Sequence, residues 1–434
     1  MSVRAVQSST PKGYMHHGTY HGIEEYELKR NGLRVLYFHD PTTPVVGLMV
    51  TYLVGSRNEA LGHTGATHLL EHLMFKGSKK FPKRKGVGPL DLFAARGAKV
   101  NATTWLDRTN YFEVLPEEHF EYALELEADR MRNAIITEKD RAEEMPAVRS
   151  EYAMGENEPL EALDKHIWAT AYQAHPYHHS TIGWLSDIEN VSIERLQRFY
   201  DTFYWPNNAY VTVVGSVERT KALALIARHF GVHQRSPHTI PTVYTQEPMQ
   251  RGRRYVEVRR AGTRNIVGVS YKVPEALHID TPALMALTGT LAHGATSRLH
   301  KALVDTKLAS AVDVIYTPFK DPGLMTFYAT LTNGTKHEKV ERIIKETGAQ
   351  IIDGGVEQSE LDRVLAQIRT ELAFARDGHY ALLSILNEAI ASGDWRYFFD
   401  MPKRLGAVTV TDVRTAARTY LSERSMTVGH YIAE

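Results

Sequence analysis

The chain has 434 residues and no cysteine, and its 51 basic side chains balance 51 acidic ones. The lack of cysteine excludes a disulfide framework, a thiolate metal site and a cysteine nucleophile, so any bound metal must be held by His, Asp or Glu. The zero net charge gives no sign of a nucleic-acid partner, and the longest apolar run, residues 45–54, is too short to span a bilayer.

The N-terminus does not contain the apolar core of a signal peptide in its first fifteen residues. We therefore expect no cleavable signal in the sequence as written. This fits a cytoplasmic protein, and it fits equally well a periplasmic protein whose signal has been removed. The compartment stays open.

Strand and helix patterns alternate along the first half of the chain. An Asn31-Gly32 turn joins the first two strand patterns, and Thr64 is the predicted N-cap of the first helix. The patterns predict strands at 24–30, 33–38, 44–54 and 210–217, a hairpin at 99–105 and 108–115, and helices at 64–75, 117–133, 139–157, 160–174 and 192–204.

A linker is predicted at residues 233–252, where prolines lie among polar residues without periodicity. It would separate an N half, residues 1–232, from a C half, residues 253–434. The C half shows the same order of a strand at 266–273, a helix at 282–303 and a hairpin at 309–331.

A weak internal repeat supports two related halves. The helix start at Ser192-Ile193-x-x-Leu196 has a counterpart at Thr409-Val410-x-x-Val413, and a strand follows each, the second at 426–431. We predict an α+β fold of two homologous halves, each a mostly antiparallel sheet with helices packed on one face. The C half would clamp substrate or form a dimer contact.

The strongest local motif is His68-Leu69-Leu70-Glu71-His72. Residues i and i+4 share one helix face, so both imidazoles can reach one metal ion, and Glu71 can point to the same place. Two imidazoles and a carboxylate with one open position suit a catalytic zinc, and this order is the inverzincin signature. The alternative is a helix whose two histidines face solvent.

A third protein ligand is predicted in the acidic stretch downstream. Glu144 and Glu151 are seven residues apart, two helical turns, and so share a face. Glu151 could ligate the metal while Glu144 accepts a ring N–H from a ligating histidine. The alternative is an ordinary solvated acidic helix face.

Further motifs follow in a fixed order, and with them the chain resembles the pitrilysin/insulinase family of zinc peptidases, which includes mitochondrial processing peptidase. The resemblance covers nearly the whole chain. Its motifs are Gly65–Ser78 with F-K-G-S, Asn101–Tyr111 with N-A-x-T and D-x-T-x-Y, Glu125–Met131, His175-Pro176-Tyr177, and Tyr204–Gly215.

The resemblance implies roles for five side chains. His68, His72 and Glu151 would bind one Zn²⁺ per chain. Glu71 would be the general base and later the proton donor to the leaving amine. Glu144 would hold a zinc-binding histidine through a hydrogen bond.

The resemblance also implies a substrate-binding strand. Asn101 and Ala102 would lie on an edge strand to which the peptide substrate adds as a further strand, with the main chain supplying affinity. Without the resemblance, Asn101 could simply be a turn residue before a strand.

The chain departs from the family pattern in its C half. Catalytic members usually have an Arg and a Tyr there, which bind substrate and stabilise the oxyanion, but Val304 and Ser310 stand at these positions. Arg298 nearby is interpreted as structural. We therefore expect a paralogous partner subunit that supplies the Arg/Tyr pair, with a homodimer as the other possibility.

Three functions are compatible with these motifs. The leading hypothesis is a zinc-dependent endopeptidase that cleaves extended peptides in a chamber, as the catalytic subunit of a heteromeric peptidase. The second is a non-catalytic structural or regulatory subunit of the same family. The third is a different metal hydrolase that uses the same His/His/Glu set.

Overall fold

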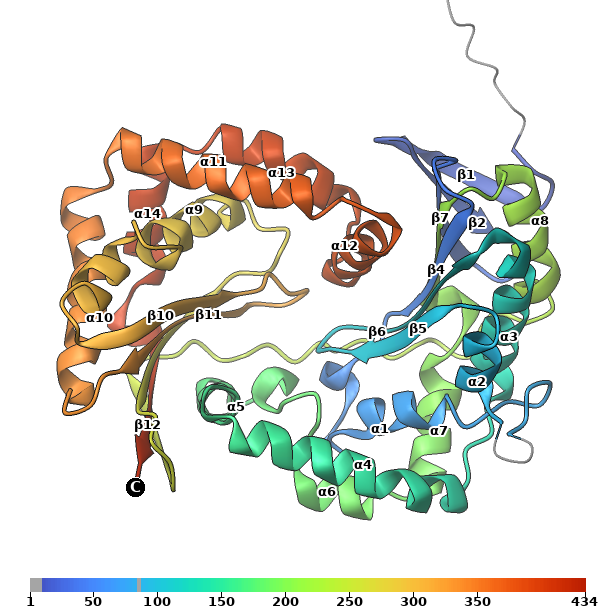
Figure 1. Cartoon of the computed structure of the whole chain (residues 1–434), viewed down its shortest axis with the longest axis horizontal. Helices are drawn as coiled ribbons and strands as arrows, with labels where there is room; N and C mark the ends of the chain where they lie inside the picture. The colour runs from blue at the N-terminus through green and yellow to red at the C-terminus, as the bar shows by residue number, and fades with distance from the viewer. Residues whose placement is uncertain (1–9, 84–86) are drawn as a thin grey trace, which may run out of the picture.

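The structure, a computed structural model of the whole chain, describes residues 10–83 and 87–434. Two β-sheets with helices layered against them make up the molecule (Figure 1). The predicted α+β class with two mostly antiparallel sheets is confirmed. Residues 1–9, which carry part of the signal-peptide prediction, lie outside the described residues. None of the described helices is both long and apolar enough to cross a membrane.

The sheet of the N half has seven strands in the order β1-β2-β3-β7-β4-β6-β5. Only the β3–β7 pair is parallel. β1 was not predicted from sequence, because it is a mostly exposed edge strand without apolar alternation. The strands are β1 (Tyr14–Tyr20), β2 (Ile23–Leu28), β3 (Leu33–His39), β4 (Val45–Tyr52), β5 (Lys99–Thr104), β6 (Thr109–Pro116) and β7 (Ala209–Gly215).

Helices cover one face of this sheet and enclose its main core. Apolar side chains of α1, α3 and α8 pack there against Val35, Leu48, Val50 and neighbouring strand residues. The helices of the N half are α1 (Ala66–Leu73), α2 (Pro89–Ala94), α3 (Phe120–Asn133), α4 (Glu138–Asn157), α5 (Pro159–Ala171), α6 (Leu185–Asn190), α7 (Ile193–Phe203) and α8 (Arg219–Phe230).

The sheet of the C half has five strands in the order β10-β11-β9-β12-β8, and only β12–β8 is parallel. Its strands are β8 (Arg254–Arg260), β9 (Ile266–Val273), β10 (Ala309–Tyr316), β11 (Gly323–Leu331) and β12 (Met426–Ala433). Its helices are α9 (Thr281–Ala292), α10 (His337–Gly354), α11 (Gln358–Phe374), α12 (His379–Ser392), α13 (Arg396–Gly406) and α14 (Val410–Tyr420).

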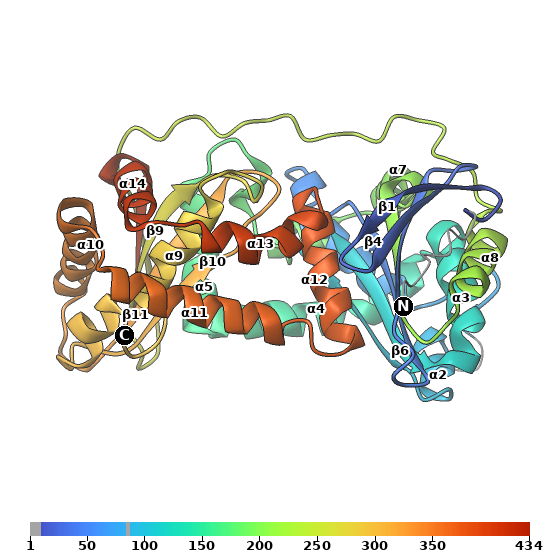
Figure 2. The ribbon, with the colours of Figure 1, turned by 90° about the horizontal axis from the view of Figure 1, so that it is seen from above.

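Residues 231–253 form neither helix nor strand. They run along one side of the molecule from the N half to the C half (Figure 2).

Each half lends one helix to the other half's sheet. α12 packs on the second face of the N-half sheet, where Leu383 and Leu386 meet Met49 and other outward strand residues. α5 packs on the second face of the C-half sheet through a cluster that includes Ile167. Each sheet therefore has its own helices on one face and one helix of the other half on the opposite face (Figure 1).

Glycines in the strands make room for α5. Gly268 and Gly429 are partners across β9 and β12. A Cβ atom on Gly268 would lie 2.6 Å from the Cδ1 atom of Ile167, and one on Gly429 would lie 2.7 Å from its Cγ1 atom. Because real Cβ contacts are longer than this, the side chain of Ile167 can approach the sheet only over glycine.

The predicted N-cap of the first helix is wrong. α1 begins at Ala66, directly after Gly65, which has a φ of 83°. Thr64 lies one residue further out, and its buried hydroxyl instead donates to Asp187 at 2.8 Å and accepts from the Trp184 N–H at 3.0 Å. Thr64 thus joins the loop before α1 to the start of α6 rather than capping α1.

The predicted helix at 282–303 is two separate segments. α9 ends at Ala292, and Gly294 follows with a φ of 77°, a backbone conformation that ends a right-handed helix. A π-helical segment then covers His300–Val304. The sequence predicted one continuous helix because the apolar pattern continues across this break.

Replacing Gly429 by valine should destabilise the contact between the halves, because the new side chain would overlap Ile167. We expect the thermal unfolding midpoint to fall by roughly 2–10 °C, as measured by differential scanning calorimetry. Gly354→Ala is the control, since a Cβ atom there meets no other atom within 4 Å. An unchanged midpoint for Gly429→Val would contradict this packing.

Candidate active site

Two acidic side chains hold the start of α1, one at its first turn and one at the loop before it. Glu59 accepts hydrogen bonds from the N–H groups of Gly65 and Thr67, both at 2.7 Å. Asp187 accepts from the N–H groups of Gly62 and Thr64 at 3.0 and 3.1 Å. Burial raises the pKa of the Glu59 carboxyl to about 8. Its contacts take up N–H groups that have no partner within the helix, and they fix where the helix points.

α1 and α4 bring the predicted metal ligands together. Glu151 Oε1 lies 3.4 Å from His68 Nε2, and Glu151 Oε2 lies 3.5 Å from His72 Nε2. The ligand atoms of the three residues all lie within 4.8 Å of one another. The structure thus places two imidazoles and a carboxylate around one point.

These separations fit a tetrahedral zinc ion. Ligands about 2.1 Å from a central metal are about 3.4 Å apart along each edge of a tetrahedron. The two separations, one from each oxygen of Glu151, match the length of such an edge and are longer than ordinary hydrogen bonds. The residues present therefore suit a zinc ion, with a fourth position left for water or substrate.

Glu144 contacts the ring nitrogen of His72 that does not face Glu151. Its Oε1 is 2.9 Å from His72 Nδ1, so the ring donates there and turns Nε2 toward Glu151. The second oxygen of Glu144 pairs with Lys76. Burial opposes the charged form of Glu144, but the bonds from Lys76 and His72 outweigh it and lower the pKa of this carboxyl.

Glu71 is close to the three residues without being one of them. Its side chain is almost buried, with 8% exposed, and Thr104 Oγ1 donates to its Oε2 at 2.6 Å. Its other oxygen, Oε1, accepts no hydrogen bond from the residues that the structure describes. A carboxylate held by one oxygen with the other free is arranged to accept a proton.

A cleft of about 660 Å³ opens over these residues, and Asn101 and Ala102 line it together with Phe75 and Lys83. Asn101 and Ala102 belong to β5, which among the described strands pairs only with β6 and forms one edge of the N-half sheet. Asn101 is therefore a strand residue and not a turn residue.

Val304 and Ser310, which stand where catalytic family members usually have Arg and Tyr, lie away from this cleft. Neither Val304 nor Ser310 lines it, and the Ser310 hydroxyl donates to the Thr330 carbonyl at 3.2 Å. Arg298 pairs with Glu360 at 2.8 Å and donates to the Gly355 carbonyl, which fits its structural interpretation.

Sequence reasoning missed three residues of this site. Thr104 and Lys76 lie inside the motifs that carry the resemblance, yet their roles depend on contacts with Glu71 and Glu144 that no spacing reveals. Glu59 has no sequence signal at all, because an acid several residues before a helix looks like any other loop residue.

The charges in the site depend on one another. Burial opposes a charged His72, but the neighbouring Glu151 and Glu144 carboxylates raise the pKa of its imidazole to about 9. His68 and His72 in turn hold the pKa of Glu151 far below its ordinary value. Without a metal, a proton therefore occupies the place where a cation would bind.

Family models match most of the chain. Residues 34–183 match the model described as insulinase, peptidase family M16. Residues 190–368 match the model described as the peptidase M16 inactive domain.

Similar proteins include named zinc proteases. Zinc protease PqqE of Helicobacter pylori is 30% identical over 419 residues, covering 95% of this chain and 94% of that protein. An uncharacterized zinc protease of Mycobacterium leprae is 26% identical over 396 residues, covering 91% of this chain and 88% of that one.

Solved structures share the fold. The crystal structure of a protease from Helicobacter pylori matches with a TM-score of 0.89 and 30% identity, covering 94% of this chain and 99% of that chain. Pitrilysin matches with a TM-score of 0.77, covering 97% of this chain and 46% of its own. Its identity is 16%, so this second match shows the fold alone.

Zinc binding should weaken as the pH falls. The metal requires a neutral imidazole, and His72, whose pKa is raised to about 9 in the metal-free protein, must release its proton first. Between pH 8.5 and 6.5 we expect the affinity to fall ~10-fold per pH unit, as measured by competition with a chromophoric chelator.

Glu144→Gln tests the cause of this pH dependence. Removing that carboxylate should lower the pKa of His72, so the fall in affinity should begin at a lower pH. Zinc affinity that does not change with pH in the unsubstituted protein would contradict the prediction.

Proposed function

Because the chain belongs to the insulinase family of peptidases, family M16, we propose that it is a zinc-dependent endopeptidase. The zinc ligands are His68, His72 and Glu151, and the general base is Glu71. The observation that carries this proposal is the convergence of the three ligand atoms within 4.8 Å, in a cleft beside the free edge of a strand.

The chemistry of the proposed reaction divides between the metal and the chain. A bound zinc ion would make water more acidic and polarise the carbonyl of the scissile peptide bond. Glu71 Oε1 takes the proton from the attacking water and later passes it to the leaving amine. Glu144 holds His72 in the orientation that points Nε2 at the metal.

The substrate binds as an added strand on β5. The outer edge of β5 has main-chain N–H and C=O groups that no other strand of the sheet takes up, and Asn101 and Ala102 lie beside the zinc ligands. A peptide paired there runs past Glu71 in an extended form. Main-chain pairing explains how such a site accepts many sequences.

A partner subunit completes the site. Val304 cannot donate a hydrogen bond through its side chain, and the Ser310 hydroxyl is occupied by the Thr330 carbonyl. The chain thus lacks the Arg/Tyr pair of catalytic family members. A paralogous subunit supplies the pair in this proposal, and a second copy of the chain is the alternative.

A non-catalytic role is the second candidate. The loss of the Arg/Tyr pair favours it. A structural subunit has no need of a zinc ion. Elemental analysis of the purified chain therefore separates the two proposals, since the peptidase should hold one zinc per chain.

Glu71→Gln should keep zinc and lose peptide hydrolysis. The amide preserves the shape of the side chain but cannot take a proton, so turnover should fall by ~10²–10⁴. The measurement is cleavage of a quenched fluorescent peptide library together with zinc content. Cleavage at the unsubstituted rate would show that Glu71 is not the base.

Activity of the purified chain should rise when the proper partner is added. A missing oxyanion donor typically lowers turnover by ~10²–10³, so a paralogue with the Arg/Tyr pair should restore a factor of this size. The same paralogue with its Tyr replaced by Phe is the matched control. Full activity of the chain alone, without further gain, would exclude the need for a partner.

A further inference from the structure

We propose that the C half acts on the active site by holding the turn between β5 and β6, residues Trp105–Arg108, and that Thr104, Asp107 and Arg108 are positioning residues for Glu71. The inference rests on the proposed function, because it concerns the orientation of the proposed base. It assigns a task to the half that carries none of the proposed zinc ligands.

The first step is the contact between Thr104 and Glu71. Thr104 is the last residue of β5, has 9% of its surface exposed and donates from Oγ1 to Glu71 Oε2 at 2.6 Å. A hydrogen bond to a carboxylate is short and strong when it is buried. The position of Thr104 therefore determines which oxygen of Glu71 stays free.

The second step joins this turn to α12. Arg108 Nη1 donates to the Thr103 carbonyl at 2.9 Å, which joins the last residue of the turn to β5. The same guanidinium pairs with Glu388 on α12, with Nε 3.1 Å from Oε1. Arg108 is 8% exposed, so a C-half carboxylate holds a nearly buried N-half cation against Thr103, the residue before Thr104.

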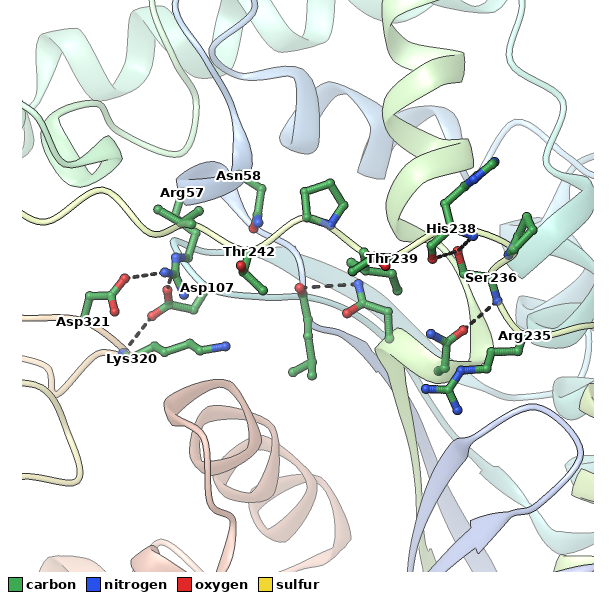
Figure 3. Close-up of a pocket in the computed structure, with 17 residues that line it drawn as sticks. Arg57, Asn58, Asp107, Arg235, Ser236, His238, Thr239, Thr242, Lys320 and Asp321 are labelled. Atoms are coloured by element: carbon green, nitrogen blue, oxygen red, sulfur yellow. Dashed lines mark hydrogen bonds and ion pairs between the residues drawn. The ribbon is translucent and has the colours of Figure 1, made fainter.

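The third step joins the turn to the loop between β10 and β11. Asp107 accepts from the Lys320 N–H at 3.1 Å and from the Tyr177 hydroxyl at 2.7 Å. Arg57 lies 3.5 Å from Asp107 and also pairs with Asp321 (Figure 3). The four charged side chains Arg57, Asp107, Lys320 and Asp321 line one end of a cavity of about 590 Å³.

Two elements of the C half, α12 and the loop between β10 and β11, thus contact a turn of four residues. The turn joins an edge strand to the sheet, a place where backbone is otherwise free to move. The Trp105 ring also lies near Phe319 of the C half, with ring centroids 6.5 Å apart. Any shift of the turn moves Thr104, its direct neighbour, and with it the carboxylate of Glu71.

The first test compares two C-half carboxylates in the metal-free full chain. Glu388→Gln removes the charge that Arg108 needs. Asp400→Asn is the matched control, since Asp400 of α13 pairs with Tyr20 on β1, at the opposite edge of the same sheet. Hydrogen exchange of residues 99–110 should be at least roughly 10-fold faster in Glu388→Gln and unchanged in Asp400→Asn.

The second test substitutes Thr104. In the zinc-loaded chain, Thr104→Val should lower kcat roughly 10- to 100-fold, the size expected for a lost bond to a charged group, with little change in KM and in zinc content. Thr104→Ser keeps the hydroxyl and should stay within about threefold of the original kcat. In crystals of the metal-free variants, the Glu71 carboxylate should move in Thr104→Val and stay in Thr104→Ser.

Two results would overturn the proposal. One is hairpin exchange in Glu388→Gln that equals exchange in Asp400→Asn. The other is a Glu71 carboxylate that keeps its place in Thr104→Val. Neither measurement requires peptidase activity. A chain that binds no zinc, or that stays inactive with its partner, would therefore refute the proposed function and leave the positioning role to be judged by exchange and crystallography.

Discussion

The approach of α1 to α4 is the contact on which the rest of the active site depends. α1 has only eight residues, too few to be stable alone in water. It is held by the burial of Leu69, Leu70 and Leu73 and by Glu59 at its N-terminus. Because this short helix is fixed at both its apolar face and its first turn, its two histidines face α4 in one orientation.

Acidic groups surround the two histidines in a chain whose formal net charge is zero. Glu71, Glu144 and Glu151 all lie within one cleft, and Lys76 balances only the second of them. Such a cluster is costly without a cation and favourable with one. The same acidic groups raise the pKa of His72, because they stabilise a positive charge on its ring when no metal is bound.

The two halves depend on each other in packing and, in our proposal, in catalysis. α12 covers a face of the N-half sheet, and α5 covers a face of the C-half sheet. The same α12 carries Glu388, which holds Arg108 beside the active site. The packing of α12, which buries apolar surface between the halves, therefore also places Glu388 against the hairpin beside Glu71.

The sequence alone determined which side chains share one face of a helix, because this depends only on spacing over a few residues. Helical spacing predicted that His68 and His72 share a face, and it placed Glu144 and Glu151 on one side of α4, because these relations are set within two turns of helix. Only the tertiary structure decided which side chains meet across long stretches of chain. Thr104 reaches Glu71 across 33 positions and Arg108 reaches Glu388 across 280, and these contacts depend on how sheets and helices pack, which no local spacing encodes.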